Sequence, residues 1–139
     1  MRSFIDTNIL VYADAGDEPV KQERALRLVA AARLSGEGVV STQVLQEFAN
    51  VALRKLRLPP GLVRERLKFY AGFEVVPVTA DLIAAAVDLH ASHQLALYDA
   101  LIVRAAIAAG CARLWSEDMH DGLRFGGLQI ANPFGVMAT

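Results

Sequence analysis

The segment SFIDTN, residues 3–8, places a carboxylate and two small polar residues at the end of a short strand-like run. Residues 3–5 predict a strand, and Asp6-Thr7-Asn8 follows it directly. In open α/β sheets ligands gather at the carboxyl ends of the strands, so an acid here is well placed to hold a hard metal ion. Asp and Asn are also common turn and N-cap residues, and the segment taken alone favours that interpretation. The positions of the other acids therefore decide between a metal site and an ordinary turn or N-cap.

Short strands and helices alternate along the rest of the chain. Further strands are predicted at residues 39–41, 74–77, 113–115 and 128–131. Helices are predicted at residues 9–13, 19–34, 43–56, 61–70, 79–93 and 98–109. The last helix is almost wholly apolar, so we expect it to be central and buried. The pattern predicts one domain over residues 1–139 of the α/β class, a three-layer α/β/α sandwich with a short, mainly parallel central sheet.

Composition narrows the class of protein. A chain of 139 residues with 54% apolar residues can bury a core without disulfides or structural metals. No segment reaches the roughly 18 uncharged apolar residues of a membrane span, and no signal-peptide pattern is visible. Cys111 is the single cysteine, which excludes an intrachain disulfide and favours a small buried apolar residue. We expect a cytoplasmic protein without a membrane partner.

Charge is unevenly distributed, although the net charge is only −1. Residues 21–68 hold 10 basic and 4 acidic side chains, a balance of +6, and the remainder holds 4 basic and 11 acidic ones, a balance of −7. Such a distribution suits a polyanionic substrate that is reached through a cation, or an ordinary solvated helical surface. The charges alone leave both open.

Three further acids stand at comparable points of the predicted fold. Glu47 lies in the helix after the second strand, at the edge of its apolar face and on the flank shared with Gln43. Asp99 opens the buried helix, and Asp118 follows the strand that ends at Trp115. Singly, each has an ordinary explanation as a border, N-cap or turn residue.

Taken jointly with Asp6, these residues favour a metal site; we call Asp6, Glu47, Asp99 and Asp118 the four acids. Parallel strands end on one edge of the sheet, so carboxylates placed there should converge. Converging carboxylates repel, and a divalent cation removes that repulsion. Oxygen ligands without a Cys or His cluster select Mg²⁺ or Mn²⁺ over zinc. His90 and His93 share a helix, but nothing near them in the sequence completes a zinc site.

The order of these motifs resembles that of PIN-domain ribonucleases, in particular the VapC toxins of prokaryotic toxin–antitoxin pairs. The resemblance covers essentially the whole chain. It rests on Asp6-Thr7-Asn8, Gln46-Glu47-Phe48, Tyr98-Asp99-Ala100-Leu101-Ile102, Ser116-Glu117-Asp118 and Ala131-Asn132-Pro133-Phe134. It implies that the four acids are the metal-binding catalytic residues.

The resemblance implies further roles. Asn8 and Ser116 are expected to support the metal or its water, and Asp121 is kept as an accessory acid beside Asp118. The implied activity is that of an endoribonuclease, which cleaves RNA with a metal-activated water and leaves a 5′-phosphate and a 3′-hydroxyl. The implied partners are RNA, a cognate antitoxin protein and a second copy of the chain in a homodimer.

Two other functions share part of this pattern. A haloacid-dehalogenase-type phosphatase also begins with an Asp at a strand end, but it needs a second Asp two residues later, where this chain has Asn8. A catalytically silent PIN-like binding module is the other, and the intact acids argue against it.

The basic helices also predict an interaction surface. Apolar residues there are expected either to form an exposed groove for an amphipathic, acidic antitoxin helix or to belong to the core. They are Leu53, Leu56, Leu58, Leu62 and Phe69, with Arg54, Lys55 and Arg57 as the basic rim.

Overall fold

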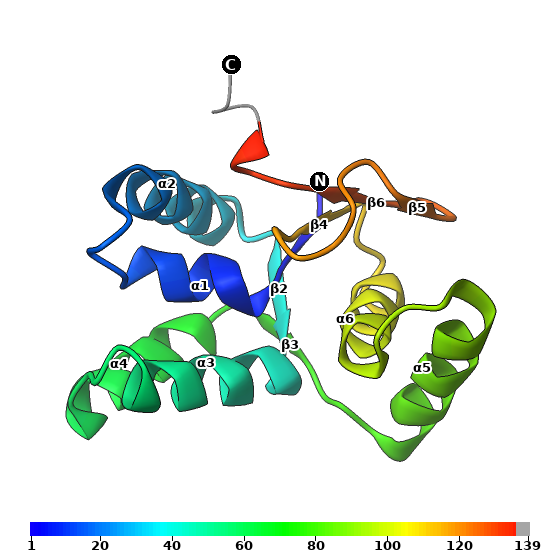
Figure 1. Cartoon of the computed structure of the whole chain (residues 1–139), viewed down its shortest axis with the longest axis horizontal. Helices are drawn as coiled ribbons and strands as arrows, with labels where there is room; N and C mark the ends of the chain where they lie inside the picture. Colours follow the sequence, from blue (N-terminus) through cyan, green and yellow to red (C-terminus); the bar gives the residue numbers. More distant parts are fainter. Residues whose placement is uncertain (136–139) are drawn as a thin grey trace.

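The computed structural model describes residues 1–135; residues 136–139, the end of the predicted single domain, lie outside the described part. A six-stranded sheet runs through the molecule in the order β3-β2-β1-β4-β6-β5 (Figure 1). The strands are β1 (Ser3–Ile5), β2 (Gly38–Ser41), β3 (Glu74–Val76), β4 (Arg113–Trp115), β5 (Arg124–Phe125) and β6 (Leu128–Ala131). All pairs are parallel except β5 with β6, so the mainly parallel sheet is confirmed.

Helices cover both faces of this sheet. They are α1 (Thr7–Ala13), α2 (Pro19–Ser35), α3 (Thr42–Arg54), α4 (Pro60–Tyr70), α5 (Ala80–His93) and α6 (Leu97–Ala108). Figure 1 shows α1 to α4 on one side of the sheet and α5 with α6 on the other. Right-handed crossovers give this division, because the chain moves from β1 to β3 in one direction and then returns to β4. The three-layer sandwich is confirmed.

Local signals explain where the helices begin and end. Thr79 caps α5, as expected, by accepting a hydrogen bond from the amide of Leu82 at 3.2 Å. Gly36, with a φ of 71°, ends α2 in the left-handed conformation that glycine adopts readily. The first helix begins at Thr7 and not at Ile9, because the Asp6 side chain accepts from the Thr7 amide and serves as the N-cap.

The core lies between the sheet and the two helical layers. Helix α6 contributes six buried residues, which confirms its central position, and Cys111 is buried as expected. Within residues 1–135, no helix is long and apolar enough to cross a membrane. On β4 and β6 the side chains alternate between buried and half-buried, and α6 packs against β4.

Candidate metal and active site

The order of the strands creates the site. From β1 the chain crosses to β2 on one side, whereas β4 lies on the other side of β1. Ligands in open α/β sheets bind at such a reversal, outside the carboxyl ends of the strands. Asp6 follows β1 and Ser116 follows β4 at this point, and the amide of Asp6 donates to the carbonyl of Trp115 at 3.0 Å.

Asp6 is the buried member of the four acids, with 5% of its surface exposed. Its Oδ1 accepts from the amide of Thr7 at 2.7 Å, and its Oδ2 accepts from Ser116 Oγ at 2.8 Å. Burial raises the pKa of Asp6 to about 6, against the hydrogen bonds from Ser116 and Thr7, and the charges of Asp118 and Glu47 raise it further. Asp6 is thus both the N-cap of α1 and a buried carboxylate whose ionised form is costly in the metal-free protein.

Glu47 lies on α3, and both oxygens of its carboxylate accept hydrogen bonds. Thr7 Oγ1 donates to Glu47 Oε1 at 2.6 Å, and Gln43 Nε2 donates to Glu47 Oε2 at 3.2 Å. The Gln43 amide also donates to the carbonyl of Tyr98 at 3.2 Å, which ties α3 to the first turn of α6. The predicted flank of Gln43 and Glu47 is confirmed, and Thr7 and Gln43 emerge as orienting residues that the sequence did not reveal.

Asp99 and Asp118 complete the set. Asp99 is half-buried in the first turn of α6, and burial, followed by the charges of Asp118 and Glu47, raises its pKa. It is not the N-cap, because α6 begins at Leu97 and Ala96 occupies the N-cap position without a side-chain hydrogen bond. Asp118 lies exposed in the loop after β4. The charges of Glu47 and Asp118 act on both Asp6 and Asp99, which links the four acids electrostatically.

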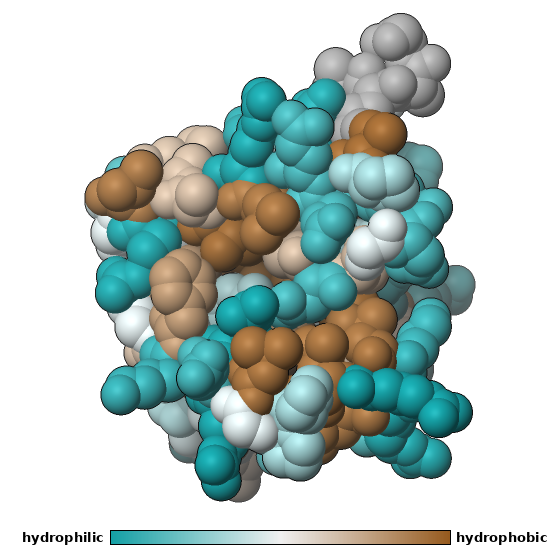
Figure 2. Space-filling model, turned by 90° about the vertical axis from the view of Figure 1, so that its left-hand side faces the viewer, coloured by the Kyte–Doolittle hydropathy of each residue, from teal (hydrophilic) through white to brown (hydrophobic). Residues whose placement is uncertain are grey.

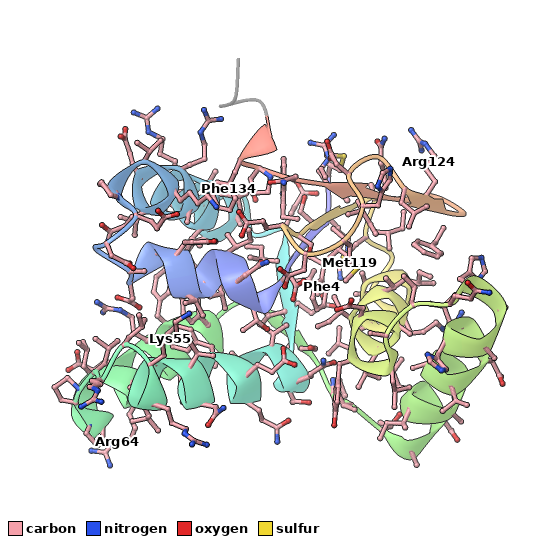
Figure 3. The ribbon with its side chains drawn as sticks, in the orientation of Figure 1. Phe4, Lys55, Arg64, Met119, Arg124 and Phe134 are labelled. Carbon is pink, nitrogen blue, oxygen red and sulfur yellow. The ribbon has the colours of Figure 1, made fainter. Side chains whose placement is uncertain are left out.

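A cleft of about 590 Å³ opens beside these acids, between α1 and α3. Asn8, Glu47 and Asp118 line it, and Lys55 contributes a cation to its wall. Figure 3 shows Lys55 at the C-terminal end of α3, on the side that faces α1. Both polar atoms of the Asn8 side-chain amide are buried here without a hydrogen-bond partner. A buried amide oxygen that lacks a donor costs free energy, and a cation in the cleft would supply its partner.

The donor set fits a hard divalent ion. Carboxylate, amide and hydroxyl oxygens are the ligands that Mg²⁺ and Mn²⁺ prefer. Within residues 1–135, however, no three acidic, imidazole or thiol side chains are already drawn together as an ion would hold them. Of the four acids, Glu47 and Asp118 line the cleft, and protein donors hold Asp6 and Glu47.

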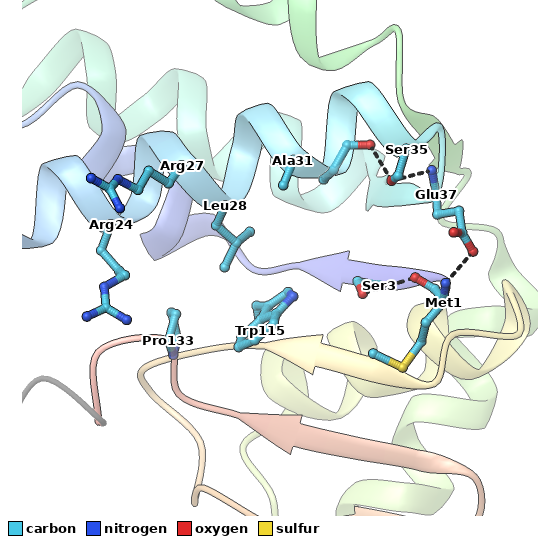
Figure 4. A pocket seen from close by; sticks show the side chains of 11 residues that line it. Met1, Ser3, Arg24, Arg27, Leu28, Ala31, Ser35, Glu37, Trp115 and Pro133 are labelled. Carbon is cyan, nitrogen blue, oxygen red and sulfur yellow. Dashed lines mark hydrogen bonds and ion pairs between the residues drawn. The ribbon is translucent and has the colours of Figure 1, made fainter.

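A second pocket, of about 480 Å³, lies between α2 and the partly open face of β4 (Figure 4). Arg24, Arg27 and Trp115 are among its lining residues. Its one carboxylate, Glu37, is paired with the amino group of Met1 at 2.6 Å. The pocket therefore offers no metal ligands, and the candidate site is the cleft beside the four acids.

Of the expected accessory residues, Ser116 contacts one of the four acids and Asp121 contacts a different loop. Ser116 contacts Asp6 directly, as expected of a supporting hydroxyl. Asp121 is exposed, and its Oδ1 accepts from the amide of Asn132 at 2.8 Å, so in this structure it fastens its loop to the chain after β6. His90 Nδ1 lies 2.5 Å from the carbonyl oxygen of Leu95 and His93 Nδ1 lies 2.8 Å from Ser92 Oγ, so both have partners without a metal.

Comparison with known proteins agrees with the fold. The family model described as PIN domain matches residues 3–121, whereas no curated protein matches the sequence. A toxin–antitoxin complex from Klebsiella pneumoniae contains a chain with a TM-score of 0.69 and 20% identity, over 94% of this chain and 97% of that one. VapC20 of Mycobacterium tuberculosis, described as a toxin that cleaves the sarcin–ricin loop, gives a TM-score of 0.68 at 20% identity, over 84% and 91%. VapBC2 from Rickettsia felis, solved with a DNA fragment from its promoter, gives 0.65 at 20% identity, over 95% and 98%.

Proposed function

Because the chain belongs to the PIN domain family, we propose that it is a metal-dependent endoribonuclease. The single observation that carries the proposal is the cleft at the strand reversal, which Glu47 and Asp118 line together with the unpartnered amide of Asn8. The proposed ion is Mg²⁺ or Mn²⁺, and the proposed ligands are the four acids, supported by Asn8 and Ser116. The family match argues against the phosphatase alternative.

The residues of this chain have distinct tasks in the proposal. The four acids would hold a divalent ion, which when bound would acidify a water and offset charge on the scissile phosphate. Ser116 keeps Asp6 oriented by its hydrogen bond, and Thr7 with Gln43 does the same for Glu47. The raised pKa of Asp6 makes its ionised form costly in the metal-free protein, so charge neutralisation by the ion is favoured.

RNA is the proposed substrate. The acids in the cleft repel a polyanion, so affinity has to come from the ion and from basic side chains outside it. Lys55 lines the cleft, and the surplus of six positive charges over residues 21–68 lies on α2, α3 and α4 and the segments that join them. The description of VapC20 as a toxin that cleaves the sarcin–ricin loop agrees with this choice.

An antitoxin is the proposed inhibitor. A groove of about 390 Å³ lies between α1, α2 and α4, and its rim exposes Leu26 and Phe69 by 50% and 43%. Figure 2 shows the face at the left of Figure 1, onto which α1 to α4 open, and on it apolar side chains gather in patches among polar ones. Of the apolar residues expected in a groove, only Phe69 lines this one: Leu53 is exposed elsewhere, and Leu58 packs partly against the core. Leu56 and Lys55 line the cleft beside the acids instead. An amphipathic helix with acidic residues suits this surface, and two of the similar structures are toxin–antitoxin complexes.

A homodimer is the proposed assembly. Ile83 and Val87 stand one helical turn apart on α5 and are 44% and 47% exposed. Helix α5 lies on the opposite side of the sheet from α1 to α4 (Figure 1). A second copy could therefore cover α5 while an antitoxin occupies the groove. Light scattering of the parent and of Val87→Glu measures this: the parent should have twice the chain mass, and the variant the mass of one chain.

The nuclease proposal is tested by RNA cleavage with purified protein in Mn²⁺ and in excess EDTA. Asp6→Asn, Asp99→Asn and Asp118→Asn should fold and lose cleavage, since each removes charge at nearly constant shape. Asp88→Asn, an exposed acid on α5, is the matched control and should cut like the parent. If all three site variants cut as fast as the parent, the proposal is wrong.

The toxin proposal is tested separately. The protein is purified alone and together with the product of the neighbouring reading frame, and RNA cleavage is compared. If the neighbouring product inhibits cleavage by the parent but not by Phe69→Glu, the groove beside Phe69 is supported as the antitoxin-binding surface. Unchanged cleavage in the presence of the neighbour would contradict the toxin role and leave the nuclease proposal intact.

A further inference from the structure

A second polar cluster lies beside the cleft, outside the proposed ligand set. Glu117 Oε1 accepts from Tyr12 Oη at 2.6 Å, and Glu117 Oε2 pairs with Lys21 Nζ at 2.5 Å. Lys21 Nζ also lies 4.8 Å from the centroid of the Tyr12 ring and 5.4 Å from that of Phe134. Figure 3 shows Phe134 beside α2, from which Lys21 comes. We call Tyr12, Lys21 and Glu117 the latch.

The contacts within the latch favour the charged forms of Lys21 and Glu117. The hydrogen bond that Lys21 donates to Glu117 raises the pKa of Lys21. Burial works to raise the pKa of Glu117, but the bonds from Lys21 and Tyr12 outweigh it and hold that pKa below its ordinary range. The Lys21 ammonium group contacts the Glu117 carboxylate and lies over the rings of Tyr12 and Phe134. These two rings pack edge to face, with 5.1 Å between their centroids. The arrangement is more constrained than an exposed ion pair, whose contribution is usually small.

The loop that the latch holds is the one that carries Asp118. Ser116 is fixed to Asp6, Glu117 is fixed by the latch, and Met119 is buried in the core. Asp118 is the exposed residue between them, and in the described part of the chain its one hydrogen bond runs from its amide to Ser116 Oγ at 3.3 Å. The direction of the Asp118 carboxylate is therefore set by its neighbours and not by contacts of its own.

We propose that Tyr12 and Lys21 are positioning residues, which act through Glu117 to hold Asp118 toward the cleft. The inference rests on the proposed metal site. It gives Glu117 a role other than that of a spare ligand, since both of its oxygens are already occupied. It also explains the contribution of Phe134, which packs on Tyr12 and Lys21 from the segment after β6.

The test compares Lys21→Met, Glu117→Gln and the milder Tyr12→Phe with the parent. Loss of an outer partner typically weakens metal binding by about 10–100-fold, so Mn²⁺ titration calorimetry should show a loss of that size for Lys21→Met and Glu117→Gln. RNA cleavage should fall mainly in kcat and little in KM. Lys21→Arg should restore both, because it keeps a cation and donors at that position. Arg27→Met, which breaks an ion pair elsewhere on α2, should leave Mn²⁺ affinity unchanged.

A metal-free readout accompanies these titrations. Amide hydrogen exchange at Asp118 should be faster in Glu117→Gln than in the parent, and unchanged in Arg27→Met. Variants that melt at lower temperature yet bind Mn²⁺ as tightly and exchange Asp118 as slowly as the parent would overturn the proposal. Failure of the parent itself to bind Mn²⁺ or cut RNA would instead contradict the proposed function, and exchange at Asp118 would still report whether the latch holds the loop.

Discussion

Replacing Asp6 with Asn should stabilise the metal-free protein at neutral pH. The carboxyl of Asp6 has a pKa of about 6 in the folded chain, against an ordinary value of 3.8. Between these values the folded state binds more protons than the unfolded state, so the free energy of unfolding falls as pH rises through about 4 to 6. At about 1.4 kcal/mol per pH unit, the ionised carboxylate costs about 3 kcal/mol above pH 6, as an upper bound.

The amide avoids this cost but keeps an imperfect version of the hydrogen bonds to Thr7 and Ser116. With about 1 kcal/mol lost there, Asp6→Asn should gain about 2 kcal/mol at pH 7.5. For a domain of this size that is roughly 6–8 °C in melting temperature. At pH 4 the parent's carboxyl is largely protonated, so the gain should disappear.

Thermal melts of both proteins at pH 4 and pH 7.5, in the presence of EDTA, measure the effect. A melting-temperature difference that is the same at both pH values would refute the reasoning. Adding Mn²⁺ should reverse the order at pH 7.5, because the ion stabilises the parent and binds the variant weakly. A Mn²⁺-induced gain in the parent that is equal at pH 5 and pH 8 would count against a clustered acidic site.

Three further predictions concern single residues. Thr7→Val removes the donor that orients Glu47, so it should weaken Mn²⁺ affinity by about 10–100-fold in calorimetry while the circular dichroism spectrum stays unchanged. Thr79→Ala removes the cap on the Leu82 amide and should cost about 1 kcal/mol in urea unfolding without affecting RNA cleavage. Burial raises the pKa of Cys111 to about 11, so its thiol should react with a disulfide reagent at pH 8 far more slowly than free cysteine, and at the free rate once urea unfolds the chain.

The positions of the four acids could be predicted from the sequence because each one follows or opens an element with a clear signal. Asp6 comes after an apolar run, and Asp99 stands at the start of an apolar helix that ends before Gly110. Parallel strands end on a common edge, so order along the chain was enough to bring these elements together.

The contacts that orient the acids could not be predicted in the same way. The bond from Thr7 to Glu47 joins residues 40 positions apart, and the bond from Lys21 to Glu117 joins residues 96 apart. Both depend on helix packing and on rotamers, which periodicity does not specify. Strand β5 was missed because it has two residues, too few for an alternation to be visible, before a turn at Gly126.

The central claim, that the four acids hold one catalytic metal centre, is tested most directly by titrating Mn²⁺ into metal-free protein in a calorimeter at pH 7.5. We expect saturable binding by the parent and by Asp88→Asn, and weak or absent binding by Asp6→Asn, Asp99→Asn and Asp118→Asn. Binding of equal strength by the parent and all three site variants would contradict the claim.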